Sequence, residues 1–258
     1  MKIATYNVWD DESGRCVRKE QLIHEIFKTD ADIIALQEVW PDFWDELIKS
    51  TDYAYYIFPN KGDKLAFLSK YPLENSFHLY DSVDFLNSVA LNVTFKHKGF
   101  VFSITNVHLP WNSVLVREKQ ILAINEYTKQ QKDIDYFLLL GDFNCSPTSS
   151  VHNFLLGEQT LLGYEVVPNP YYDLARVHAS LNNYAVIPTL DFATNPRWKD
   201  NNTKFVPAIL DRILFMDNAS YGDYFIHDVR VFGTDISPET GFAPSDHYGV
   251  LAKLGFTE

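Results

Sequence analysis

The segment from Phe137 to Asn144 changes abruptly from apolar to polar residues. Four apolar residues, Phe137-Leu138-Leu139-Leu140, predict a short buried strand, and Gly141-Asp142-Phe143-Asn144 follows them directly. A strand that runs into Gly-Asp places a carboxylate and an amide at the mouth of a strand, where a loop reaches a ligand. Gly-Asp is also ordinary turn chemistry, so this segment alone leaves a site and a turn both open.

Three more predicted strand ends carry residues that can bind a metal ion. They are Thr5-Tyr6-Asn7, Leu36-Gln37-Glu38 and Ser245-Asp246-His247. A lone salt bridge or turn explains any one of these polar ends, but it does not explain why so many strands end in matching residues. The recurrence therefore favours a functional site built from several strand ends.

Hydrophobic periodicity predicts more strands than helices. Helices are expected over 17–28, 41–50 and 114–131, the last with Leu115, Ile121, Leu122 and Ile124 facing inward. Strands are expected over 2–8, 32–36, 65–69, 73–78, 89–95, 100–107, 209–215, 224–231 and 249–254. The stretch 157–207 has weak periodicity, and a loop region of that length is usually functional or partly helical.

Only some of the predicted strands are joined by helices. This pattern favours an α/β fold in which two mixed β-sheets pack face to face with helices outside. With 258 residues, 46% of them hydrophobic, the chain has enough apolar surface for a large core, and we expect a single domain over 1–258.

The charge of the chain limits its partners. Its formal net charge is −12, from 22 Lys and Arg against 34 Asp and Glu. Such a chain has no global field that attracts long nucleic acid. Arg197, Lys199 and Lys204 form a local basic cluster that keeps a DNA substrate open. Some of the negative charge is expected to bind cations, which would offset it.

The cysteines and the hydropathy pattern bear on location. The chain has two cysteines, Cys16 in a polar segment and Cys145 directly after Asn144, and free thiols in a cytoplasmic setting are the simpler interpretation. We find no apolar run of signal-peptide type and no run of 18 apolar residues, so no membrane span is expected.

Glu38, Asp142 and Asn144 have the chemistry of a hydrolytic site. Glu38 is the ligand type that Mg²⁺ prefers, although a Glu before Trp40-Pro41 could instead cap a helix. Asp142 and Asn144 alternate along the chain, so both can point to one side of an extended segment. There Asp142 could take a proton from water while Asn144 orients that water. The alternative is an Asx-turn leading into Ser146-Pro147.

The histidines supply the remaining candidates. His247, if its ring bonds to a buried Asp211, would keep its other nitrogen aimed at substrate and could stabilise charge on a phosphate. The alternative for Asp211 and Asp246 is a structural salt bridge with a neighbouring cation. His108 follows an apolar strand and, taken alone, is more often a sheet-edge residue than a catalyst.

Seven segments of the chain together resemble the endonuclease/exonuclease/phosphatase superfamily, whose members include deoxyribonuclease I. They occur in the family's order and span nearly the whole chain. The matching segments are Thr5-Tyr6-Asn7-Val8, Leu36-Gln37-Glu38-Val39, Leu68-Ser69-Lys70-Tyr71-Pro72-Leu73, Asn106-Val107-His108-Leu109, Gly141-Asp142-Phe143-Asn144, Leu210-Asp211-Arg212-Ile213 and Ser245-Asp246-His247.

The resemblance implies a four-layer α/β sandwich and phosphoester hydrolysis that depends on a divalent metal, Mg²⁺ or Mn²⁺. It also implies a role for each matching residue. Glu38 would be the principal metal ligand with Asn7 beside it, and Asp246 would support the metal or the histidine. The catalytic group would comprise Asp142, Asn144, His247, Asp211 and His108.

Two features concern the branch of the family. The segment Thr189–Asn195, with the two segments after it, looks most like the tyrosyl-DNA phosphodiesterase branch, and this places Asp191 and Asn195 among the substrate-binding residues. Some nucleases of the family carry an acidic residue two positions after the first Asn. Here Trp9 occupies that position and Asp10 comes one later.

Tryptophans follow three of the proposed strand ends. Trp9, Trp40 and Trp111 come shortly after Asn7, Glu38 and His108, and Trp198 lies in the long segment near Asp191. Together they suggest an aromatic rim over the metal site, although Trp9 and Trp40 could equally be core residues.

The net charge favours a small-molecule or lipid phosphodiester as substrate. A DNA-directed nuclease or tyrosyl-DNA phosphodiesterase is the alternative. A non-catalytic binding module of the same fold stays open as a third hypothesis.

Overall fold

The computed structural model describes residues 1–59, 64–80, 88–166, 169–198 and 207–257. Within these ranges it has two six-stranded sheets. The first sheet has the order β11-β12-β1-β2-β4-β3, and β1 runs parallel to β2. Its strands are β1 (Lys2–Asn7), β2 (Ile33–Gln37), β3 (Tyr55–Ile57), β4 (Ala66–Ser69), β11 (Asp223–Phe232) and β12 (Gly249–Thr257).

The second sheet has the order β5-β6-β7-β8-β10-β9, and β7 runs parallel to β8. Its strands are β5 (Asn75–Tyr80), β6 (Ser88–His97), β7 (Phe100–His108), β8 (Tyr136–Asp142), β9 (Tyr172–Asp173) and β10 (Asp211–Asp217). Both sheets contain parallel and antiparallel pairs, as the sequence predicts.

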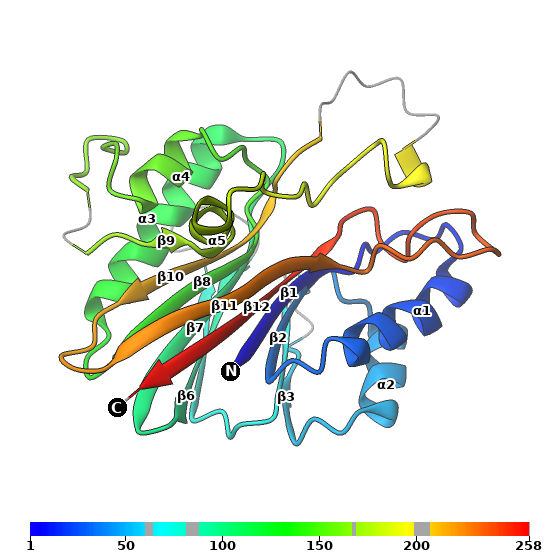
Figure 1. Ribbon diagram of the computed structural model, residues 1–258, viewed down its shortest axis with the longest axis horizontal. Coiled ribbons are helices and arrows are strands. Elements are labelled where there is room, and N and C mark those ends of the chain that lie inside the picture. The colour runs from blue at the N-terminus through cyan, green and yellow to red at the C-terminus, as the bar shows by residue number, and fades with distance from the viewer. Residues whose placement is uncertain (60–63, 81–87, 167–168, 199–206, 258) are drawn as a thin grey trace.

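Helices cover the outer faces of the two sheets (Figure 1). α1 (Arg15–Lys28) and α2 (Pro41–Ser50) lie on the first sheet, and α3 (Val114–Gln130) and α4 (Ser150–Leu155) lie on the second. α5 (Leu174–Asn182) contacts β10 and β11, one strand from each sheet. The predicted α/β sandwich of two packed mixed sheets flanked by helices is therefore confirmed.

Side chains of the central strands alternate between two apolar layers. In β8, Leu138 and Leu140 face the core between the sheets, whereas Phe137 and Leu139 face the helices. Because both faces of the sheet are covered at β8, this strand is apolar from Tyr136 to Leu140, and this explains the continuous apolar run in the sequence.

Helix boundaries and burial differ from prediction in places. α1 begins at Arg15 rather than at residue 17. Leu115 was expected to face inward, but its side chain is 51% exposed. This expectation is wrong because the buried face of α3 begins only at Arg117, so the first turn does not pack on the sheet.

The segment 157–207 is partly helical, as expected: its described part contains α5 and a single 3-10 turn, η1 (Pro196–Trp198). β3, β9 and α4 were not predicted. Each has six residues or fewer, too short for a periodic pattern. Among the described residues, no helix is long and apolar enough to cross a membrane.

Candidate active site

At one end of the sandwich the side chains between the sheets change from apolar to polar. Gln37 on β2 donates from Nε2 to Asn106 Oδ1 on β7 (2.7 Å) and to Thr5 Oγ1 on β1 (3.0 Å). Asn106 in turn donates to the carbonyls of Leu36 (2.9 Å) and Ala66 (3.2 Å). This amide pair joins the two sheets directly beneath the site. Gln37 and Asn106 received no role from the sequence, and the only signal for them is that each precedes a candidate residue by one or two positions.

Asn7 lies at the centre of the site, and its amide connects the two sheets. Its Nδ2 donates to Glu38 Oε1 (3.0 Å) and to Asp142 Oδ2 (3.1 Å), while its Oδ1 accepts from the Trp9 N–H (3.0 Å). Both Asn7 and Asp142 are 1% exposed. The nitrogen of Asn7 faces the carboxylates and its oxygen accepts the Trp9 N–H, so the amide orients Glu38 and Asp142; a role of Asn7 beside the metal ion stays a prediction.

Glu38 has a left-handed backbone (φ 57°), which is strained for a residue with a side chain and turns its carboxylate at the end of β2. Its Oε2 accepts from the backbone N–H of Asp10 at 2.9 Å. The carboxylate of Asp10 is bound by both Arg15 and Lys64. The Asp10 amide, rather than an acidic side chain, therefore supports Glu38 at this position of the chain.

Asp142 and Asn144 combine the two alternatives that the sequence leaves open. Asn144 N donates to Asp142 Oδ1 (2.8 Å), as in an Asx-turn, and Asn144 Nδ2 lies 3.3 Å from Asp142 Oδ2. Asn144 Nδ2 also donates to the Leu109 carbonyl (2.9 Å). The turn is thus present, and it holds the Asp142 carboxylate in the site.

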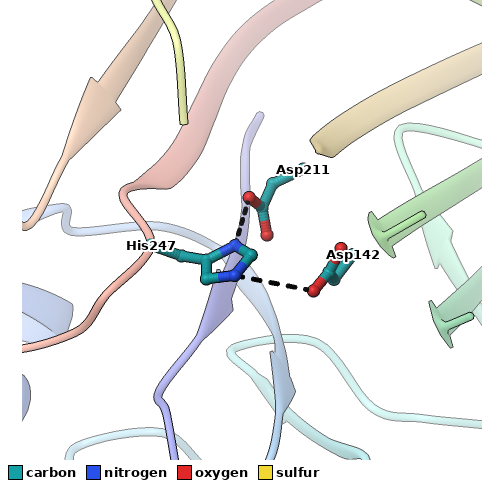
Figure 2. Close-up of side chains that lie close together, drawn as sticks. All are labelled: Asp142, Asp211 and His247. Atoms are coloured by element: carbon teal, nitrogen blue, oxygen red, sulfur yellow. Dashed lines mark hydrogen bonds and ion pairs between the residues drawn. The ribbon is translucent and has the colours of Figure 1, made fainter. Parts of the chain in front are cut away.

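His247 lies between two buried carboxylates from the second sheet. Its Nδ1 is 2.8 Å from Asp211 Oδ2 and its Nε2 is 3.8 Å from Asp142 Oδ2, as Figure 2 shows. Burial alone lowers the pKa of His247, but the charges of Asp211, Asp142 and Asp246 together raise that pKa well above its usual value. The short bond to Asp211 directs Nε2 toward the open part of the site.

Hydrogen bonds with two hydroxyl groups hold the backbone of Asp211 and of His247 in place. The Thr189 hydroxyl oxygen accepts from the N–H groups of Leu210 (3.0 Å) and Asp211 (3.1 Å), at the start of β10. The Ser245 hydroxyl donates to the Asn7 carbonyl (2.7 Å) and accepts from the His247 N–H (3.2 Å). Thr189 and the Ser245 side chain received no role from the sequence.

His108 and Asp246 complete the polar group. His108 Nε2 is 3.7 Å from both Glu38 Oε1 and Asp142 Oδ2. Asp246 is half-buried, and its pKa is raised to about 6 by burial and by the charges of Glu38 and Asp142, against the opposing effect of His247. All eight residues predicted for catalysis and metal binding thus lie in one region, at the same end of the sandwich.

Six of these eight residues, all except Asn7 and Asp211, line a cavity of about 620 Å³. The rest of its wall is apolar and aromatic, from Trp111, Leu190, Phe192, Trp198, Ala208 and Leu210. Trp111 is 77% exposed at the rim, and Trp198 donates from its indole nitrogen to the Asp246 carbonyl at 3.2 Å. Trp198 also packs edge-on against Phe192.

The expected aromatic rim is only partly present. Trp9 and Trp40 are 7% and 2% exposed, so the idea that they stack on substrate is wrong. Trp9 packs between the guanidinium groups of Arg18 and Arg197, at 4.0 and 4.5 Å from its ring centre. In the basic cluster suggested for DNA, Arg197 therefore contacts an indole, while 199 and 204 lie outside the described residues.

The structure places Asp191 and Asn195 in supporting positions behind the cavity wall. Asp191 accepts from the Ala193 N–H and the Thr194 hydroxyl (both 2.9 Å) and so closes its own turn. Asn195 is fully buried and donates to the Ser245 carbonyl (2.9 Å). Neither is among the residues that line the cavity, and the polar atoms of both are bonded to other parts of the protein.

Several known proteins are similar to this chain in sequence or in structure. Protein angel of Drosophila melanogaster is 28% identical over 185 residues, which cover 60% of this chain and 51% of that protein. The chain thus spans about half the length of that relative. Humanized D. rerio TDP2 carrying 14 mutations has a TM-score of 0.78 at 18% identity, with 100% of this chain and 99% of that chain covered.

Two further solved structures share the fold. D. rerio TDP2 complexed with single-strand DNA product has a TM-score of 0.78 at 17% identity and covers 99% of this chain and 98% of that one. A mannosyl-6-phosphatase of Bacteroides thetaiotaomicron has a TM-score of 0.74 at 17% identity, with 99% and 100% covered.

The family model described as the Endonuclease/Exonuclease/phosphatase family matches residues 4–247. This range runs from β1 to His247, so it includes the whole polar group described above and confirms the resemblance inferred from the sequence. The chain therefore belongs to the endonuclease/exonuclease/phosphatase family.

Proposed function

We propose that this protein is a divalent-metal-dependent phosphoester hydrolase that acts by attack of water on phosphorus. One observation carries the proposal: the Asn7 amide joins the carboxylates of Glu38 and Asp142 beside the Asp211–His247 pair. Membership of the family supports phosphoester hydrolysis as the reaction class.

The charges of the site fit a bound cation. Neither Glu38 nor Asp142 has a Lys or Arg nitrogen within ion-pair distance among the described residues; only the two histidines lie that close. Asp142 also belongs to a cluster with Asp211 and His247 whose potential ligand atoms lie within 4.8 Å of one another. Oxygen-rich sites of this kind suit Mg²⁺ or Mn²⁺, and Glu38 with Asp246 would hold the ion. When bound, the ion would acidify water and neutralise charge on the phosphate.

Residues of the chain would accept the proton of the attacking water and orient that water. Asp142 would accept the proton of the attacking water, and the Asn144 amide would orient that water. His247, held by Asp211 through Nδ1, would donate from Nε2 to a phosphate oxygen and stabilise the charge that develops there. His108, equidistant from Glu38 and Asp142, would contribute a second hydrogen-bond donor to the phosphate.

The cavity supports a small substrate with an aromatic or apolar group. Its volume falls in the usual range for small-molecule sites, and Trp111, Phe192 and Trp198 line its wall. We therefore favour a small-molecule or lipid phosphodiester. DNA is the second candidate, because one similar structure, D. rerio TDP2, is complexed with a single-strand DNA product.

Hydrolysis of bis-p-nitrophenyl phosphate with Mg²⁺ or Mn²⁺ tests the reaction class. We expect turnover that EDTA abolishes, together with a rise in melting temperature on adding millimolar metal. No turnover on a broad phosphoester panel, with no metal-dependent shift, would instead support a non-catalytic module. A fluorescence titration with single-stranded DNA, with Ca²⁺ replacing Mg²⁺, decides the substrate class: tight, salt-sensitive binding would favour DNA.

Two broader features belong to the same proposal. Pairing of β1 with β12 joins both ends of the chain in one sheet, which supports a single domain over 1–258.

Cys16 and Cys145 are both free thiols, which supports a cytoplasmic location.

A further inference from the structure

Arg212 is a buried cation behind the site, on the face of β10 that is turned away from the cavity. The residue is 1% exposed. Its Nη2 donates to two backbone carbonyls, Cys145 and Ile209, both at 2.6 Å. Its guanidinium also lies over the Phe143 ring, 5.5 Å from the ring centre. A single nitrogen therefore connects two segments that are far apart in the sequence.

These two segments carry the proposed catalytic carboxylates. Residues 142–145 leave the end of β8 with Asp142 and Asn144, and residues 209–211 enter β10 with Asp211. Asp211 and Asp142 form the last pair of the β8–β10 ladder. Beyond it, the backbone bond from Phe143 N to the Leu210 carbonyl (3.0 Å) continues the contact. Arg212 bridges the Cys145 and Ile209 carbonyls just past that bond.

Asp173 lies within ion-pair distance of the guanidinium but makes no hydrogen bond to Arg212 Nε. Its Oδ2 is 4.0 Å from Arg212 Nε, and its Oδ1 accepts from the N–H groups of Ala175 and Arg176 at the start of α5. Asp173 is 3% exposed, so both charges are out of water. A buried ion pair of this kind is weak evidence for stability, since an apolar pair often replaces it without loss. Its geometry instead suggests a role in placing the loops.

We propose that Arg212 is a positioning residue, which sets the separation of Asp142 from the Asp211–His247 pair by clamping the Cys145 and Ile209 carbonyls. The inference deepens the proposed function and rests on it for its kinetic test. Arg212 touches neither the cavity nor substrate, so its removal should change the rate of the chemical step and leave substrate binding nearly intact.

Two variants separate positioning from stability. Arg212→Met removes the guanidinium and leaves the buried Asp173 carboxylate without this cation, although His152 Nε2 still lies 3.6 Å from Asp173 Oδ2. The double variant Arg212→Met with Asp173→Asn removes that leftover charge and keeps a side chain that caps α5 well. Phe256→Leu, at the opposite end of the sandwich core, serves as a control for destabilisation alone.

We expect kcat for bis-p-nitrophenyl phosphate to fall on the order of 10²-fold in both Arg212 variants, because small displacements of catalytic groups are costly. KM should change by less than about threefold. The melting temperature should recover toward wild type in the double variant, while kcat should not. Recovery of kcat together with stability, or an equal kcat loss in Phe256→Leu, would overturn the proposal.

Amide hydrogen exchange gives a readout that needs no activity. Peptides that cover 141–146 and 207–211 should exchange faster in both Arg212 variants than in wild type, while peptides from β1 and β12 should not. In Phe256→Leu the same two peptides should keep their protection. If both regions stay protected in the double variant, Arg212 does not hold them. If the wild-type protein has no phosphoesterase activity, the proposed function fails. The exchange result would still show whether Arg212 holds the two segments in place.

Discussion

Asp142 and Asp211 are directly opposite partners on neighbouring antiparallel strands, at the point where β8 ends and β10 begins. Opposite residues of such a pair point to the same face of a sheet, so both carboxylates enter the space between the sheets. Both are 1% exposed; burial raises the pKa of Asp211, the charge of His247 opposes that rise, and the charge of Asp142 adds to it. His247, brought from the first sheet, lies between them and offsets this repulsion.

Replacing Asp142 by Asn should abolish most turnover while the fold survives. The side chain keeps its shape, but it can no longer accept a proton from water, and general-base contributions are typically ~10²–10⁴-fold. Steady-state kinetics and circular dichroism measure the two effects. Near-normal kcat in a folded variant would remove Asp142 from the mechanism.

Glu38→Gln should raise the Mg²⁺ or Mn²⁺ concentration that gives half-maximal activity, roughly 10- to 100-fold. The amide keeps the bond from the Asp10 N–H but loses the charge that would hold the ion. Asp191→Asn is the matched control, because this carboxylate closes its own turn and does not line the cavity. An unchanged metal titration for Glu38→Gln would place the ligand elsewhere.

Trp111→Ala should weaken the binding of aromatic phosphodiesters by about 1–3 kcal/mol per stacked ring and leave metal affinity unchanged. Its indole is 77% exposed, so the melting temperature should stay the same. Trp198→Ala should also weaken binding, but it should destabilise the protein because it loses the bond to the Asp246 carbonyl. Equal KM values for wild type and Trp111→Ala, on both aromatic and small substrates, would contradict a stacking role.

The protein should become less stable as the pH is lowered, because His152 resists protonation in the folded state. This side chain is fully buried, and burial together with the charges of Arg212 and Arg176 lowers its pKa from 6.5 to about 3. Below pH 6.5 the unfolded chain binds a proton at His152 while the folded chain does not, so the free energy of unfolding decreases as pH falls toward 3. Between pH 7 and 5 the loss should be about 2 kcal/mol.

Urea unfolding of wild type and His152→Gln at the two pH values isolates that contribution. The variant should lose about 2 kcal/mol less than wild type over this interval. The same pH dependence in both proteins would mean that His152 titrates normally in the folded state.

Gly141→Ala should destabilise the protein by about 3 kcal/mol or more, since strain and overpacking add. Gly141 has φ +133°, and a Cβ built there would lie 2.0 Å from the Val107 carbonyl oxygen of β7. Gly163→Ala is the control: Gly163 also has positive φ (+82°), but nothing lies within 4 Å of its Cβ position. Its cost should be limited to about 1–2 kcal/mol of backbone strain. Similar melting temperatures for both variants would show that the contact with β7 is not tight.

Local patterns in the sequence were sufficient for the long elements and for the location of the site. Helices such as α3 and strands such as β8 have enough residues for periodicity to be read. Short elements escaped because β9 has two residues and α4 has six, and tertiary contacts alone stabilise segments of that length. The start of β10 at Asp211 was likewise placed two residues early, since its boundary depends on pairing with β8.

The sequence by itself determined which residues have the chemistry of the site, because the carboxylates, amides and histidines can be recognised directly after the predicted strands. Only the tertiary structure decided how they divide the work. It turned the nitrogen of Asn7 toward Glu38 and Asp142, buried Trp9 between two guanidinium groups while leaving Trp111 exposed, and placed Arg212 behind the loops. The reason is physical: residue type sets what a side chain can bind, whereas its partners and its exposure depend on segments distant in the sequence that the fold brings together.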